Sequence, residues 1–168
     1  VLVVKNVLTG KRLARQRFGS WLLFLLIVVL LVACDSEVDF DQPPDIVYGE
    51  DVCESCSMII NEARYAAAYV TADGEAHRFD DIGGMLVYNQ ELAEDVTVFW
   101  VHDFDSEEWL KAEQAHFVKG DHITPMGFGI VAFAGLDRAE AGAAEEGGTV
   151  MSFADLLAEG ETSEYDHE

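Results

Sequence analysis

The sequence predicts an α+β fold in which two small strand–strand–helix halves pack as one compact unit. Two observations support this prediction. A pair of strand-like stretches joined by a turn precedes a helical stretch, and a second series of strands and helices follows it. In addition, FDDI at residues 79–82 and FADL at residues 153–156 both place an aromatic, an acidic and an aliphatic residue ahead of a helix. We interpret this echo as a sign of two related halves.

The first half is expected to begin with a β-hairpin. Residues 65–71 (YAAAYVT) are typical of a strand, residues 72–74 (ADG) form a turn signal, and residues 75–79 return as the paired strand. Asp80 and Asp81 then precede an apolar stretch. Acidic residues at this point favour the start of a helix through capping and the helix dipole.

The second series of elements is expected to begin with a strand at residues 96–101 (VTVFWV), which is rich in β-branched and aromatic residues. Ser106 opens a stretch (SEEWLKAEQA, residues 106–115) that predicts a short helix with a serine N-cap. The remaining predictions are strands at 117–118, 128–134 and 150–153, and helices at 136–146 and 153–159.

Residues 1–33 are predicted to be a lipoprotein signal peptide. Residues 1–20 carry five basic side chains and no acid, and the apolar run that follows is shorter than the ~20 residues of a spanning helix. The run ends in LVAC at 31–34, which resembles the lipobox of bacterial lipoproteins. This resemblance implies cleavage before Cys34, acylation of Cys34, and an extracytoplasmic protein held on the lipid bilayer. A plain signal peptide or a short anchor helix is the alternative.

The mature chain is expected to have three parts, which are an acidic tether at 34–50, a domain at 51–159 and a polar tail at 160–168. The tether contains Pro43-Pro44 and shows no sustained periodicity. Because five of the ten basic residues and none of the acids precede Cys34, the mature chain has 5 basic and 32 acidic residues, a net charge of −27. Such a surface repels nucleic acid, which excludes that class of partner, and it would attract cations and basic proteins. Because the acids are scattered and not focused, we favour the plainer interpretation that they serve solubility or adaptation to a saline habitat.

The motif CESCSM at 53–58 contains the only two cysteines besides Cys34. A structural zinc site usually needs four Cys or His ligands, and the chain has no second CxxC and no suitably spaced histidine pair. Haem attachment needs a histidine directly after the second cysteine, where Ser57 stands. Zinc binding, thiol–disulfide redox chemistry and a structural disulfide all remain open for Cys53 and Cys56.

Met58 adds a fourth interpretation of the motif. If the chain is extended from Cys56, the Cys56 and Met58 sulfurs point to the same face. A thiolate with a thioether is a soft donor set that favours Cu(I). Met126 lies between Pro125 and a glycine, in a loop where its side chain is free to project. Candidates for a further ligand are Met85, His102 and His122.

The motifs together resemble those of the NosL family. They are CxxCSMII at 53–60, RYAA at 64–67, FDDIGGM at 79–85, Trp109, and TPMGFG at 124–129. Members of this family are copper-binding lipoproteins associated with maturation of nitrous-oxide reductase. The resemblance implies a carrier of Cu(I), not an enzyme, that passes copper to nitrous-oxide reductase or to its membrane assembly complex. It also implies an α+β fold of two treble-clef-like halves.

By the same resemblance, Cys56 and Met58 match the best-fixed part of the family motif. Cys53 matches a cysteine common in the family, and Met126 matches the methionine of the TPM loop. Two departures are Ser57, where glycine is usual, and Gly84, where some relatives have cysteine. We expect a monomer. The alternatives are a thiol–disulfide redox protein using Cys53 and Cys56, or a zinc-binding structural subunit of an assembly complex.

Overall fold

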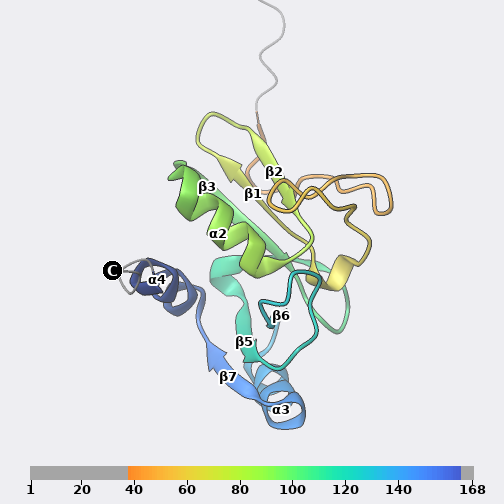
Figure 1. Cartoon of the computed structure of the whole chain (residues 1–168), viewed down its shortest axis with the longest axis vertical. Coiled ribbons are helices and arrows are strands. Elements are labelled where there is room, and N and C mark those ends of the chain that lie inside the picture. The colour runs from red at the N-terminus through yellow and green to blue at the C-terminus, as the bar shows by residue number, and fades with distance from the viewer. Residues whose placement is uncertain (1–37, 164–168) are drawn as a thin grey trace, which may run out of the picture. The chain divides into compact units, whose positions relative to one another are not determined.

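A computed structural model of the chain describes residues 38–163 and shows an α+β fold with two small antiparallel sheets and their helices (Figure 1). The chain divides into two units, residues 1–38 and 39–168. The predicted signal peptide, Cys34 and residues 164–168 lie outside the described residues. Within residues 38–163, no helix is long and apolar enough to cross a membrane.

The first half contains a four-stranded antiparallel sheet. A 3₁₀ turn, η1 (Ala63–Tyr65), leads into it. Its elements are, in chain order, β1 (Ala67–Thr71), β2 (Ala76–Phe79), α2 (Ile82–Leu92), β3 (Val96–His102) and β4 (Trp109–Lys111). The strand order is β2-β1-β3-β4. The predicted hairpin is confirmed, with Ala67 opposite Phe79 and a turn in which Gly74 N–H donates to the Thr71 carbonyl.

The second half contains a three-stranded antiparallel sheet with strand order β6-β5-β7. Its elements are, in chain order, β5 (His116–Gly120), β6 (Ile130–Phe133), α3 (Leu136–Glu146), β7 (Gly148–Met151) and α4 (Phe153–Ser163). The prediction of two related halves is therefore confirmed. Both run strand, strand, helix, strand, and in both the first strand lies between the other two.

The similarity between residues 79–82 and 153–156, however, does not mark equivalent positions in the two halves. Phe79 ends β2 and α2 begins three residues later. In the second half Phe133 ends β6 and α3 likewise begins three residues later. The structural counterpart of FDDI at 79–82 is thus FAGL at 133–136, whereas residues 153–156 begin α4, which has no counterpart among the elements of the first half.

The helix predicted for residues 106–115 is wrong. Residues 109–111 form β4 on the edge of the first sheet, and Ala112–Gln114 form a 3₁₀ turn, η2. Trp109 pairs with His102 and its ring lies 3.7 Å from the histidine ring. Ser106 caps no helix, because its N–H and hydroxyl both donate to Asp103 in a turn. Ladder hydrogen bonds and the burial of an indole outweighed the local preference for a helix.

One hydrophobic core joins the two halves. Tyr69, Phe79 and Phe99 enter it from the first sheet, and Phe117 and Phe153 enter it from the second half. The Phe99 and Phe153 rings lie 5.0 Å apart, in direct aromatic contact. The core continues up to the motif at residues 53–58, because Cys53 and Met85 are both completely buried within it.

Residues 39–50, which we expected to be part of a tether, pack against the first sheet. Phe40 contacts the face of that sheet opposite α2, beside Trp100. Arg78 Nε donates to the Asp45 carbonyl at 2.7 Å, and Tyr48 donates toward His102. Two aromatic residues in an acidic stretch supplied these contacts.

Candidate metal centre

The CxxC motif lies in a tight loop at the end of a short two-stranded ribbon. Val52 and Ile59 form an antiparallel bridge, and Cys53 N–H donates to the Met58 carbonyl at 2.7 Å. Inside the loop, Ser57 N–H donates to the Cys53 carbonyl at 2.8 Å. Glu54 N–H donates to a backbone carbonyl of β2 at 3.1 Å, which fixes the loop against the first sheet. Backbone hydrogen bonds therefore position both cysteines.

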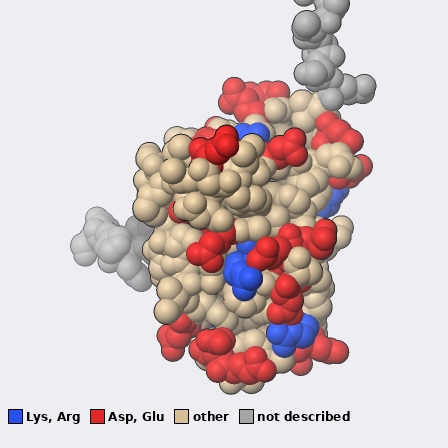
Figure 2. All heavy atoms as spheres, turned by 90° about the vertical axis from the view of Figure 1, so that its right-hand side faces the viewer, with Lys and Arg blue, Asp and Glu red and all other residues tan. Residues whose placement is uncertain are grey.

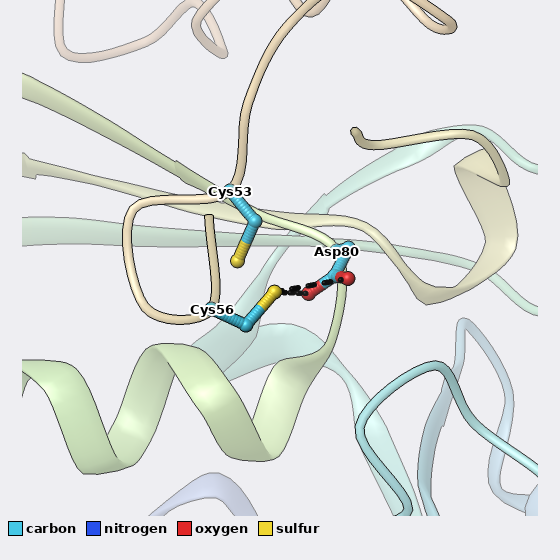
Figure 3. A group of neighbouring side chains, drawn as sticks. All are labelled: Cys53, Cys56 and Asp80. Carbon is cyan, nitrogen blue, oxygen red and sulfur yellow. Dashed lines mark hydrogen bonds between the residues drawn. The ribbon is translucent and has the colours of Figure 1, made fainter. Parts of the chain in front are cut away.

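Cys53, Cys56 and Asp80 form a compact cluster of possible metal ligands (Figure 3). One ligand atom of each residue lies within 4.8 Å of the other two. The Cys56 thiol donates to the Asp80 carboxylate, with the Sγ atom 3.4 Å from Oδ2 and 3.6 Å from Oδ1. Cys53 and Asp80 are buried, whereas Cys56 is partly exposed. An ion would therefore enter from the Cys56 side.

Burial sets the protonation state of the inner thiol. It raises the pKa of Cys53 to about 12, although backbone hydrogen bonds from Asp80 and Cys56 act in the opposite direction. Cys53 is thus a neutral thiol near pH 7 and must lose its proton to bind a metal. Two thiolates suit soft ions, and the described residues offer no fourth His, Cys or acidic ligand to complete a zinc site.

Asp80 is a site residue that the sequence reasoning missed. Both acids at 80 and 81 were assigned to the helix start, but only Asp81 caps α2, by accepting a hydrogen bond from Gly83 N–H at 2.8 Å. The equivalent positions in the second half are Ala134 and Gly135. The strand-to-helix connection therefore needs no acid at position 80. In the sequence, the only indication of a separate role for Asp80 was that Asp81 alone is enough to cap the helix.

Met58 does not lie as the sequence argument assumed. The backbone at Ser57 has φ = 62°, which is left-handed, so the chain turns between Cys56 and Met58 instead of running extended. The Met58 side chain is 49% exposed at the edge of the loop. Its participation in metal binding stays a prediction. The left-handed φ also explains why glycine suits position 57.

Met126 reaches the start of α2, close to the CxxC loop. A β-carbon added to Gly84 would lie 2.5 Å from the Met126 sulfur and 3.7 Å from the Ser55 hydroxyl. Met126 N–H donates to the side chain of Asp81 at 3.0 Å, which holds the 121–129 loop on the helix start. The absence of a side chain at Gly84 is what gives the thioether its place beside the loop.

The further candidates from the sequence make the following contacts in the structure. Met85 is a core residue. His102 has both ring nitrogens in hydrogen bonds, to the Tyr48 hydroxyl at 2.8 Å and the Glu107 carbonyl at 2.7 Å, and burial lowers its pKa. His122 packs against Phe104, and neither histidine belongs to the cluster of Cys53, Cys56 and Asp80.

Comparisons with known proteins agree with this fold. The family model described as NosL matches residues 45–160. A similar solved structure is the crystal structure of the copper chaperone NosL from Shewanella denitrificans, with a TM-score of 0.60 and 21% sequence identity. The match covers 68% of this chain and 94% of that chain, and it shows a shared fold. Among curated proteins, none matches this chain.

Proposed function

Because the chain belongs to the NosL family, we propose that it is a copper chaperone that binds Cu(I) at Cys53 and Cys56. The observation that carries this proposal is the cluster in which two thiol sulfurs and the Asp80 carboxylate lie within 4.8 Å of one another. Copper is here a cargo to be carried, so the activity is binding and delivery and not catalysis.

The chemistry of the donors favours Cu(I). Cysteine thiolates are soft ligands, and Cu(I) accepts a small number of them, whereas a structural Zn²⁺ site usually needs four ligands. Asp80 orients the Cys56 thiol by accepting its hydrogen bond. The Met126 thioether at the start of α2 and the Met58 thioether at the loop edge are further soft donors. Thioethers survive oxidising conditions that would join two thiols.

The delivery step is proposed to serve the maturation of nitrous-oxide reductase. The lipobox-like sequence before Cys34 supports an extracytoplasmic protein anchored to the bilayer by lipid. The recipient would be the reductase or its membrane assembly complex. The mature net charge of −27 favours a basic recipient surface.

Thiol–disulfide exchange is the main alternative, and the position of Cys53 argues against it. Redox-active cysteines are accessible and have lowered pKa values. Cys53 is completely buried and its pKa is raised to about 12. Cys56 is partly exposed, and its thiol donates a hydrogen bond to the Asp80 carboxylate.

The test is an anaerobic titration of the reduced protein with Cu(I), in competition with a chromophoric chelator. We expect one tightly bound ion per chain and a loss of affinity in Cys56→Ser. Met126→Leu should weaken binding, whereas Met151→Leu, on β7, is the matched control and should not. The proposal fails if Cys56→Ser binds Cu(I) as tightly as the wild type. Tighter binding of Zn²⁺ than of Cu(I) would favour the structural zinc role instead.

A further inference from the structure

Exposed apolar side chains lie directly beside the candidate metal centre. Across the bridge that carries the CxxC loop, side chains alternate between the core and solvent. Cys53 and Ile60 are buried, while Val52 and Ile59 are 52% and 48% exposed. Residues opposite each other in a bridge have neighbouring side chains, so Val52 and Ile59 form one apolar surface.

A second apolar element lies at the start of α2, in the loop at residues 121–129. Phe128 covers the start of α2, because a β-carbon on Gly83 would lie 2.2 Å from the Phe128 ring. In the same 121–129 loop, Ile123 is 90% exposed. Single exposed apolar residues are ordinary on protein surfaces. Apolar residues grouped near a metal centre indicate an interaction surface.

The charged residues around this surface are mostly acidic. Residues 45–62 contain no Lys or Arg and five acids, which are Asp45, Glu50, Asp51, Glu54 and Glu62. The two arginines that flank this segment are already engaged, Arg64 with Glu107 at 2.8 Å and Arg78 with Asp51 at 3.9 Å. Figure 2 shows the face on which residues 38–62 lie in Figure 1, and acidic side chains outnumber basic ones there.

From these observations we propose that Val52, Ile59 and Phe128 form a docking patch for a protein whose contact surface is apolar at its centre and rimmed by Lys and Arg. The proposal rests on the proposed function and names the chemistry of the copper recipient. A second copy of this chain and an anionic lipid surface are disfavoured occupants, because both would meet the acidic border with like charge.

The two parts of the patch make different contributions to binding. Opposite charges at a rim mainly raise the association rate, and salt screens them. Buried apolar contacts at the centre mainly slow dissociation. Docking at this patch would also cover the partly exposed Cys56 thiol and shield the metal from solvent.

The experiment measures binding of the copper-loaded full chain, in detergent, to two purified probes, apo nitrous-oxide reductase and its membrane assembly complex. For Val52→Ser with Ile59→Ser, we expect at least about a tenfold rise in Kd, since central apolar residues dominate interface energies. Leu92→Ser is the matched control, because Leu92 is 51% exposed at the end of α2. Association of the wild type should slow severalfold when salt is raised.

Several outcomes would overturn the proposal. These are unchanged binding of the double variant, an equal loss in Leu92→Ser, an association rate indifferent to salt, or no binding of the wild type to either probe. Self-association of the wild type that the double variant abolishes would assign the patch to a second copy instead. Cu(I) titration of each variant separates the two proposals, because a failed docking patch leaves copper binding intact and a failed copper site does not.

Discussion

Substitution of Gly84 by alanine should weaken copper binding without unfolding the protein. The new β-carbon would lie 2.5 Å from the Met126 sulfur, so the sulfur must move by about 1 Å to reach ordinary contact. Methionine has three rotatable side-chain bonds and can make this movement. Alanine also has the higher helix propensity, by up to about 1 kcal/mol. The free energy of unfolding should therefore change little.

The effect on copper follows from the displaced thioether. If the Met126 sulfur binds Cu(I), we expect Gly84→Ala to raise the Kd by about tenfold, equivalent to ~1.4 kcal/mol. The assay is the competition titration with a Cu(I) chelator, together with thermal unfolding. Gly83→Ala is a contrasting variant, since its β-carbon would meet the base of the Phe128 ring at 2.2–2.3 Å. That clash should cost about 1–3 kcal/mol of stability.

A double-mutant cycle decides whether the mechanism is correct. In a Met126→Leu background, Gly84→Ala should cause little further loss of affinity, because both changes remove the same ligand. An unchanged Kd for Gly84→Ala alone would refute the reasoning. So would an additive loss in the double variant, since the effect of Gly84→Ala would then not act through Met126.

Three other predictions concern the CxxC loop. Ser57→Gly should stabilise the protein by about 1 kcal/mol and raise Tm by a few degrees, because the serine has φ = 62°, and Ser57→Ala should not. The free energy of unfolding of the wild type, relative to that of Cys53→Ala, should be constant below pH 9 and fall as the pH rises toward about 12. The reason is that the Cys53 thiol has a higher pKa in the folded protein than in the unfolded chain. Urea unfolding at several pH values would measure this, and a difference in free energy that does not change with pH would contradict it. Excess oxidised glutathione should oxidise Cys53 and Cys56 to a disulfide and abolish Cu(I) binding until a reductant is added. If the protein still binds Cu(I) after all free thiols are lost, this prediction is wrong.

Elements with a strong local signal were predicted correctly. The hairpin at 67–79 has strand-forming residues and a turn signal, the start of α2 has an aspartate cap, and residues 136–146 are rich in helix-forming residues. The helix predicted for residues 106–115 is wrong because the structure of this segment depends on pairing with β3, the strand just before it in the chain. Neither that pairing nor the contact of Trp109 with His102 enters the helix propensity of the segment itself.

By itself, the sequence determined which chemistry is available, since two cysteines in a CxxC motif and the methionines around them define a soft donor set. Only the tertiary structure decided the geometry of that set. It turned the chain at Ser57 so that Met58 lies half exposed at the loop edge, brought Met126 to Gly84, and placed Asp80, not its neighbour, beside the thiols. The physical reason is that a donor's type is a property of its residue, whereas its position follows from packing between segments far apart in sequence.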